Sequence, residues 1–363
     1  MTSTDTTIAA VKQALSTYVE PMLGSDLVST KCVKDIQLDD GRLTIQLAFG
    51  FHCLGAHSDL QTSLAKLLRD IEGVRGVEVK VTSKVSAHVV QKSVEPLKNI
   101  RNIIAIASGK GGVGKSTVAA NLALALKAEG AKVGMLDADI YGPSQPRMLG
   151  VSGRPESSDG RTMDPIMSYG IQSMSIGFLV EEETPMIWRG PMVTQALEQL
   201  LSETNWADLD YLIVDLPPGT GDTQLTLAQK IPVSGAVIVT TPQDIALLDA
   251  RKGFKMFEKV GVSVLGVVEN MSVHICSNCG HEERIFGQGG GDRMSKQYDI
   301  DLLGTLPLEM SIRENADSGE PTVAKDPDGR VTAEFRSIAR RTSAKLSLLP
   351  KNYAQSFPSI TVG

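Results

Sequence analysis

Hydrophobic and polar positions follow two different patterns on the two sides of residue 100. In the first part, every second residue from Leu43 to Phe49 is apolar, which predicts a strand with one buried face. A turn signal at residues 39–41 pairs this strand with another one as a hairpin. Apolar residues at helical spacing flank the hairpin, so the pattern predicts a small α+β domain over residues 1–85. Its expected strands are residues 33–38, 42–49 and 77–81, and its expected helices are residues 8–18 and 57–71.

After residue 101, short apolar runs alternate with stretches of helical or loop character. These runs have no polar face, which is typical of strands in a parallel sheet that helices cover on both sides. The fold class expected for residues 102–348 is therefore α/β, with a mostly parallel, doubly wound sheet. Residues 86–101 carry several basic side chains and are expected to form a solvated linker, and residues 349–363 a polar tail. The expected strands are residues 102–107, 133–137, 211–216, 236–241, 264–268 and 302–306.

A glycine-rich loop joins the first of these strands to a run of helix-forming residues. It reads Ser108-Gly109-Lys110-Gly111-Gly112-Val113-Gly114-Lys115-Ser116-Thr117, and such a loop between a strand and a helix binds phosphates. The glycines let backbone N–H groups converge on a polyphosphate, and the positive end of the following helix faces the same anion. Lys115 is placed to reach the β- and γ-phosphates, and the Ser116 hydroxyl to bind Mg²⁺. The loop predicts that this chain binds a nucleoside triphosphate.

Acidic residues follow two other strands of the predicted sheet. Ligands of such sheets bind beyond the carboxyl ends of the strands, so these acids are candidates for the same site. Asp215 stands at the end of one strand, in the position from which a carboxylate holds Mg²⁺ through water, and Gly219 follows where a loop can sense the γ-phosphate. Asp137 and Asp139 follow a second strand. Capping of a helix that starts near Ser144 is the alternative role for this pair.

The second lysine of the loop narrows the class of nucleotide-binding protein. The run from Lys110 to Lys115 resembles the deviant Walker A class, which includes the nitrogenase iron protein and the ATPases of cell division and DNA partition. The resemblance implies a homodimer in which Lys110 reaches the partner's nucleotide, much as an arginine finger does. It implies that Lys110, Lys115 and Asp139 are catalytic, with Asp139 orienting the attacking water, and that Asp137 assists Mg²⁺ binding. Asn270 would bind adenine, which makes the nucleotide ATP; a turn role is the alternative.

A Cys-x-x-Cys pair, Cys276 and Cys279, lies on a loop shortly after the strand 264–268. Its spacing lets both thiolates bind one metal centre, and three interpretations are open. The favoured one is an iron–sulfur cluster, since [4Fe–4S] needs four thiolates and a twofold dimer supplies two from each chain. The second is a structural zinc site completed by His274 and His281. The third is a redox dithiol.

Composition and charge exclude several classes of protein. The 363 residues carry 36 basic and 42 acidic side chains, a net charge of −6, which argues against a nucleic-acid binder. No apolar run reaches the roughly 18 residues that span a bilayer, and the first residues lack the features of a secretory signal. Four cysteines do not make a disulfide scaffold. The cytoplasm is therefore the expected location, and Cys32 and Cys53 are expected to be buried thiols.

The ordered set of motifs from residue 102 to the mid-320s resembles the Mrp/ApbC-type iron–sulfur cluster carrier ATPases, and the first domain resembles domains of iron–sulfur assembly proteins. The resemblance implies a homodimer that holds a labile cluster between Cys276 and Cys279 of both chains. The dimer would take the cluster from a scaffold and pass it to apo-proteins. Slow ATP hydrolysis would change how the dimer holds the cluster. Two alternatives are a surface-binding ATPase of spatial regulation, marked by a basic helix at 331–348, and an electron donor. The matching stretches are 108–117, 137–144, 188–192, 215–222, 241–244, 270–279 and 286–290.

Overall fold

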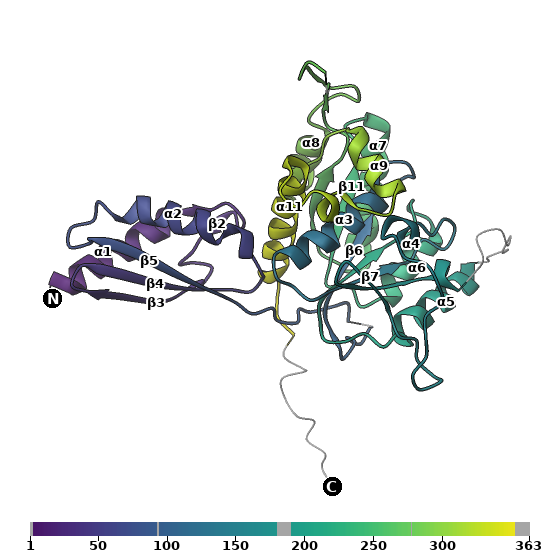
Figure 1. Ribbon diagram of the computed structural model, residues 1–363, viewed down its shortest axis with the longest axis horizontal. Coiled ribbons are helices and arrows are strands. Elements are labelled where there is room, and N and C mark those ends of the chain that lie inside the picture. The colour runs from purple at the N-terminus through teal and green to yellow at the C-terminus, as the bar shows by residue number, and fades with distance from the viewer. Residues whose placement is uncertain (1–2, 93, 180–189, 277, 353–363) are drawn as a thin grey trace, which may run out of the picture.

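The computed structural model describes residues 3–92, 94–179, 190–276 and 278–352, which form two parts (Figure 1). The first part has a three-stranded sheet in the order β3-β4-β5, with β3 antiparallel and β5 parallel to the central β4. The predicted α-β-β-α-β order is confirmed, with one additional short hairpin, β1-β2, after the first helix. The bounds are α1 (Ser3–Thr17), β1 (Val19–Glu20), β2 (Ser25–Asp26), β3 (Val33–Asp39), β4 (Arg42–Phe49), α2 (His57–Leu68) and β5 (Gly76–Ser83).

The core of the first part forms around β4. Every second residue of β4 is buried, and these side chains pack in one cluster with residues of α1 and α2. Cys32 and Cys53 belong to the same cluster and are buried, as predicted. Ala344 of the last helix also joins this cluster, so the small domain shares its core with the second part.

The second part is built on an eight-stranded sheet in the order β15-β12-β11-β6-β10-β7-β9-β8. All neighbouring strands are parallel except β8 and β9. All six predicted strands are present. The edge pair β8-β9 was not predicted, because its short strands mix polar and apolar residues. The bounds are β6 (Ile100–Ala107), β7 (Val133–Asp137), β8 (Ile166–Ser168), β9 (Ile171–Ser175), β10 (Leu209–Asp215), β11 (Gly235–Thr240), β12 (Val264–Glu269) and β15 (Leu302–Thr305).

Helices cover both faces of this sheet, which confirms the doubly wound class. Ile104 of β6 packs in a cluster with α3 and α11, whereas Ile103 and Ala105 pack in another with α5 and α6. Alternate side chains of β6 therefore pack into two separate hydrophobic cores, one on each face of the sheet. The bounds are α3 (Lys115–Ala128), α4 (Gln145–Met148), α5 (Gly190–Ser202), α6 (Asp222–Lys230), α7 (Asp244–Lys259), β13 (His274–Ile275), β14 (Glu282–Glu283), α8 (Gly290–Tyr298), α9 (Met310–Asp317), α10 (Thr322–Lys325) and α11 (Arg330–Ser347).

A buried ionic cluster joins the two parts, with α11 lying between them (Figure 1). Glu129, directly after α3, has a fully buried side chain that accepts hydrogen bonds from Arg336 Nε and Arg340 Nη1 of α11, each at 2.8 Å. The same carboxylate accepts the backbone N–H of Gly55 in the small domain at 2.8 Å. One side chain thus ties together the end of α3, the last helix and the small domain.

The expectation of a solvated linker is wrong for part of residues 86–101. His88 and Gln91 are buried, and Gln91 Nε2 donates to the carbonyl oxygens of Ala228 and Ile231 at 2.6 and 3.1 Å. These carbonyls lie at the end of α6, where helix backbone groups lack intrahelical partners. The linker therefore docks onto the second part by completing a helix end. Residues 353–363 of the expected tail lie outside the described residues.

The basic C-terminal helix, which would mark a surface-binding ATPase, packs on its own domain. Phe335 and Ile338 of α11 are buried in the core that α11 shares with α3, and its arginines Arg336 and Arg340 bind Glu129. Within the described residues, no helix is long and apolar enough to cross a bilayer. The position of α11 therefore counts against a surface-binding role for this helix.

We expect Glu129→Ala to loosen the small domain from the rest of the chain. The substitution leaves two partly buried arginines without their carboxylate, which costs about 3 kcal/mol in comparable clusters. Thermal unfolding should begin several degrees lower, and limited proteolysis should cut faster near residues 84–98. Glu334→Ala is the matched control, because Glu334 lies exposed on α11. Equal melting and equal cleavage in the two variants would contradict the role of Glu129.

Candidate nucleotide site and cysteine hairpin

The phosphate loop spans the turn between the end of β6 and the start of α3. Gly114 has a left-handed backbone, with φ +80°, and a Cβ there would lie 2.3 Å from Asn270 Nδ2. A Cβ on Gly109 would lie 2.1 Å from the backbone of α7, so both positions require glycine. The Cβ positions of Gly111 and Gly112 meet no atom within 4 Å. The loop is thus packed on one side and open to a ligand on the other.

Lys115 begins α3 and is almost fully buried. Its ammonium forms an ion pair with Asp215 and lies 3.8 Å from Asp139 Oδ2 and 3.3 Å from Ser116 Oγ. A buried ammonium is costly unless it is paired, and Asp215 provides that partner. A phosphate in the loop would offer the same ammonium a second anion, so nucleotide binding and the Lys115–Asp215 pair are linked.

Asp137 and Asp215 end the neighbouring strands β7 and β10 and face each other in register. Both side chains are completely buried. Asp137 Oδ2 accepts hydrogen bonds from the backbone N–H groups of Ser144 and Gln145 at 3.0 Å and from the Ser175 hydroxyl at 3.1 Å. Burial, together with the nearby Asp215, raises the pKa of Asp137 to about 7. This carboxyl therefore anchors the loop after β7 and sits next to a second acid.

Three carboxyl groups share one ammonium at this edge of the sheet, because Asp139 lies there as well. Burial raises the pKa of Asp139, so both Asp137 and Asp139 favour a bound proton or cation over an unscreened charge. Among the described residues, no three His, Cys, Asp or Glu side chains form a metal-binding group. A cation such as Mg²⁺, which keeps water and phosphate ligands, would suit these acids, and the Ser116 hydroxyl lies 3.3 Å from the same ammonium.

Asn270 closes the other side of the phosphate loop. Its Nδ2 donates to the Val113 carbonyl at 2.9 Å, which leaves its amide oxygen to accept from an exocyclic amine such as that of adenine. A pocket of about 210 Å³ opens beside it. Residues of the phosphate loop, of the turn after β12 and of the segment before α9 line this pocket, among them Gly114, Thr117, Asn270, Met271, Pro307 and Leu308.

Gly219 and Lys110 lie at the rim of the loop. The Gly219 N–H donates to the Ser108 carbonyl at 2.9 Å, so the turn after β10 is attached to the phosphate loop. Lys110 is half-buried, and it forms no ion pair within the described part of the chain. Its ammonium is therefore open to an anion at the rim of the loop.

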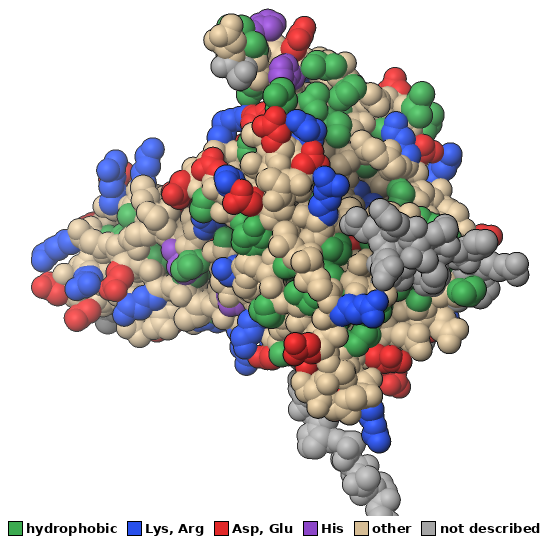
Figure 2. All heavy atoms as spheres, turned by 45° about the vertical axis from the view of Figure 1, so that its right-hand side comes forward, with side chains coloured by type: hydrophobic (Ala, Val, Ile, Leu, Met, Phe, Trp, Pro, Cys, Tyr) green, Lys and Arg blue, Asp and Glu red, His purple; other side chains and the backbone are tan. Residues whose placement is uncertain are grey.

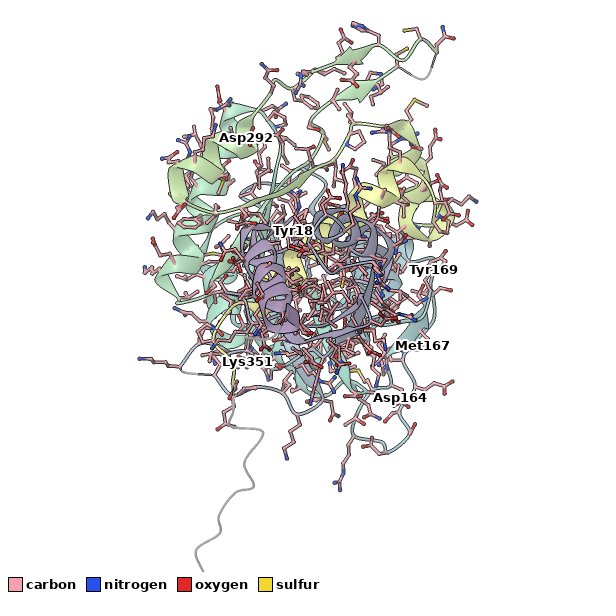
Figure 3. All side chains as sticks on the ribbon, turned by 90° about the vertical axis from the view of Figure 1, so that its left-hand side faces the viewer. Tyr18, Asp164, Met167, Tyr169, Asp292 and Lys351 are labelled. Carbon is pink, nitrogen blue, oxygen red and sulfur yellow. The ribbon has the colours of Figure 1, made fainter. Side chains whose placement is uncertain are left out.

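The hairpin of β13 and β14 carries Cys276 and Cys279 at its tip. It stands clear of the domain in Figures 1 and 3, and Figure 2 places histidine and acidic side chains around it. The Cys276 N–H donates to the His281 carbonyl at 2.9 Å, and its carbonyl accepts the Gly280 N–H at 2.8 Å. Backbone N–H groups of Asn278 and Cys279 lower the pKa of the Cys276 thiol. The turn thus favours the thiolate, which is the form that binds metals.

The hairpin does not assemble the zinc site considered from the sequence. His274 Nδ1 lies 3.0 Å from the Leu308 carbonyl, to which it donates. No histidine joins Cys276 and Cys279 in a metal-binding group within the described residues. The pair also lies in a hairpin turn, whereas a redox dithiol of the usual kind opens a helix. Among the residues that the structure describes, the hairpin therefore offers two neighbouring thiols and no third His, Cys, Asp or Glu ligand that forms a group with them.

Sequence reasoning missed two residues that complete the acidic cluster. Gln145 donates to Asp215 and is almost completely buried, and Ser175 donates to Asp137. Gln145 directly follows the acidic stretch 137–144, and this position in the sequence was a signal that its side chain lies near the site. Ser175 ends the unpredicted strand β9, so no pattern in the sequence placed it near the site.

The comparison with protein families agrees with this geometry. The family described as "NUBPL iron-transfer P-loop NTPase" matches residues 99–343. The chain belongs to this family of iron-transfer P-loop NTPases. A second family, "iron-sulfur cluster assembly protein", matches residues 8–81. The iron-transfer NTPase resemblance inferred from the motifs, and the type of the small domain, are thereby confirmed.

Curated relatives of this P-loop NTPase carry matching descriptions. The iron-sulfur cluster carrier protein of Escherichia coli K12 is 52% identical over 339 residues, which cover 93% of this chain and 92% of the relative. The mouse iron-sulfur cluster transfer protein NUBPL is 52% identical over 259 residues, which cover 71% of this chain and 81% of the relative.

Solved structures support the fold of this P-loop NTPase. A nucleotide-binding protein from Archaeoglobus fulgidus in complex with ADP is 37% identical, with a TM-score of 0.57 over 66% of this chain and 93% of that one. The cell division ATPase MinD of Pyrococcus furiosus is 24% identical, with a TM-score of 0.51 over 66% of this chain and 97% of that one. The second likeness concerns the fold alone.

We expect the four cysteines to differ sharply in their reactivity toward iodoacetamide. Burial raises the pKa of Cys53 to about 12 and also raises that of Cys32, whereas the pKa of the partly exposed hairpin thiol Cys276 is lowered. At neutral pH, peptide mass spectrometry of the native protein should find label on Cys276 and Cys279, and label on the other two only after unfolding. Native labelling of Cys53 at the rate of Cys276 would contradict this arrangement.

Proposed function

We propose that this chain is a homodimeric ATPase that carries an iron–sulfur cluster and transfers it to apo-proteins. The cluster, its cargo, would be held by Cys276 and Cys279 of both chains and received from a scaffold protein. Unpaired cysteines suit a reducing compartment, and we expect the protein to act in the cytoplasm. The observation that carries the proposal is that one continuous segment serves both the nucleotide site and the cysteine hairpin.

That segment begins with Asn270, which holds the phosphate loop through Val113, and reaches Cys276 six residues later. Its path is fixed to the neighbouring segment 306–308. The Ser272 N–H donates to the Leu306 carbonyl at 2.9 Å, and the Leu308 N–H donates to the Val273 carbonyl at 2.8 Å. Leu308 also lines the pocket beside Asn270. A nucleotide in this pocket would therefore press on the residues that position the hairpin.

The nucleotide part of the proposal draws on the loop, the acids and the pocket together. Lys115 and the open backbone of Gly111 and Gly112 suit phosphates, and the acidic cluster suits Mg²⁺, which supplies charge at the phosphates when bound. Asp139 is placed near Lys115, where it would orient the attacking water. The free amide oxygen of Asn270 suits the exocyclic amine of adenine, and the nucleotide-binding protein from Archaeoglobus fulgidus is described in complex with ADP.

The cluster part of the proposal follows from the number of thiols. A [4Fe–4S] cluster takes four thiolates, and the hairpin offers two, so two hairpins must meet. The exposed tip permits such a meeting, and it also leaves the cluster open to a recipient. A pair of chains related by a twofold axis brings equivalent surfaces together, and it gives Lys110 an anion to contact across the interface.

Protein reconstituted with iron and sulfide in the absence of oxygen should hold about two iron and two sulfide per chain. A Cys276→Ala/Cys279→Ala double variant should lose both, because no other described thiols lie at the surface. Cys32→Ala is the matched control and should keep the cluster. Stoichiometric zinc without sulfide in the wild type would overturn the carrier function and leave an ATPase with a structural loop.

Complementation between inactive variants tests whether Lys110 acts on the partner's nucleotide. Lys110→Ala and Asp139→Ala should each abolish ATP hydrolysis. After subunit exchange in an equal mixture, half of the dimers are mixed and each has one intact composite site, so roughly a quarter of the wild-type rate should return. A mixture of Lys115→Ala with Asp139→Ala should regain no ATP hydrolysis, because Lys115 and Asp139 both act within their own chain and every site in a mixed dimer then lacks one of them. If the mixture of Lys110→Ala with Asp139→Ala hydrolyses no ATP, Lys110 acts within its own chain.

A further inference from the structure

Gln145 occupies the centre of the acidic cluster, although it carries no charge. It is 1% exposed at the start of α4. Its Nε2 donates to Asp215 Oδ2 at 2.9 Å and to the Ser116 carbonyl at 3.0 Å, and its backbone N–H donates to Asp137 Oδ2 at 3.0 Å. One residue therefore binds the acid at the end of β10, the phosphate loop and the acid at the end of β7.

The contacts fix the orientation of the side-chain amide. Nε2 lies between two oxygens, and both can only accept hydrogen bonds from it. The reversed orientation would place the amide oxygen of Gln145 against the Asp215 carboxylate and the Ser116 carbonyl, where three acceptors would repel one another. The amide nitrogen thus faces the protein, and the amide oxygen faces away from these two partners.

That oxygen, Oε1, is buried and has no hydrogen-bond partner within the described part of the chain. Buried acceptors are nearly always satisfied, because an unpaired one loses its hydrogen bonds to water without replacement. A donor is therefore expected at this point. The surrounding groups, Asp215 and the Ser116 backbone, are acceptors, and Ser116 Oγ lies on the side where Mg²⁺ is expected.

We propose that Gln145 is a positioning residue of the nucleotide site, which orients the Asp215 carboxylate through Nε2 and accepts a hydrogen bond from a Mg²⁺-bound water through Oε1. Water bound to Mg²⁺ is a strong donor, and Mg²⁺ keeps several such waters. The inference rests on the proposed nucleotide function and deepens it. Lys115 pairs with Asp215 Oδ1, so Gln145 holds the other carboxylate oxygen, Oδ2, apart from the ammonium.

The role predicts a defect that depends on Mg²⁺ and not on the fold. In Gln145→Met, which keeps the length of the side chain and loses both polar atoms, the Mg²⁺ concentration for half-maximal binding of fluorescent ADP should rise about tenfold or more. Binding of ADP in EDTA should change less than about threefold, since the phosphate loop is intact. If the methionine variant folds poorly, the same measurement on Gln145→Ala replaces it, and the Mg²⁺ concentration for half-maximal binding should rise there as well.

Gln91→Met is the matched control, because Gln91 is also a buried glutamine but has all its partners at the end of α6. It should lower the melting temperature and leave the Mg²⁺ dependence of ADP binding unchanged. Gln145 variants with the Mg²⁺ dependence of the wild type would overturn the positioning role alone. A wild-type chain that binds ADP equally with and without Mg²⁺ would overturn this role and leave nucleotide binding standing, whereas a wild-type chain that binds no ADP would overturn the nucleotide function.

Discussion

The ion pair between Lys115 and Asp215 is the interaction on which the nucleotide domain depends. Parallel strands bring their carboxyl ends to one edge of the sheet, so the acids after β7 and β10 meet there, completely buried. A single ammonium does not balance Asp137, Asp139 and Asp215, and burial raises the pKa of Asp137 and Asp139. Mg²⁺ bound at the nucleotide would add positive charge next to these acids.

Two elements connect this cluster with distant surfaces of the molecule. β12 ends at the phosphate loop through Asn270 and continues into the cysteine hairpin. α3 begins at Lys115 and spans 14 residues, or about 21 Å, to Glu129 and the small domain. Both connections are short and hydrogen-bonded at each end. In the proposed carrier, these are the elements through which a change at the phosphates would reach the thiols and the first domain.

The sequence predicted most of the architecture. Buried parallel strands are continuous apolar runs, and a glycine-rich loop of this kind lies between a strand and a helix. The prediction failed where partners are distant in the chain. The linker was expected in solvent, yet Gln91 binds the end of α6 more than 130 residues away. β8 and β9 were missed because an edge hairpin needs no continuous apolar run, and with them Ser175, which donates to Asp137.

The sequence by itself determined the phosphate loop, the acids at the strand ends and the cysteine pair, since each depends on residues close together in the chain. The tertiary structure alone decided how these groups meet. It placed Asp215 on Lys115, turned Gln145 into the cluster, and buried Glu129 between two domains. It also placed His274 Nδ1 on the backbone carbonyl of Leu308. These outcomes follow from burial and from hydrogen bonds between distant segments, which local patterns do not encode.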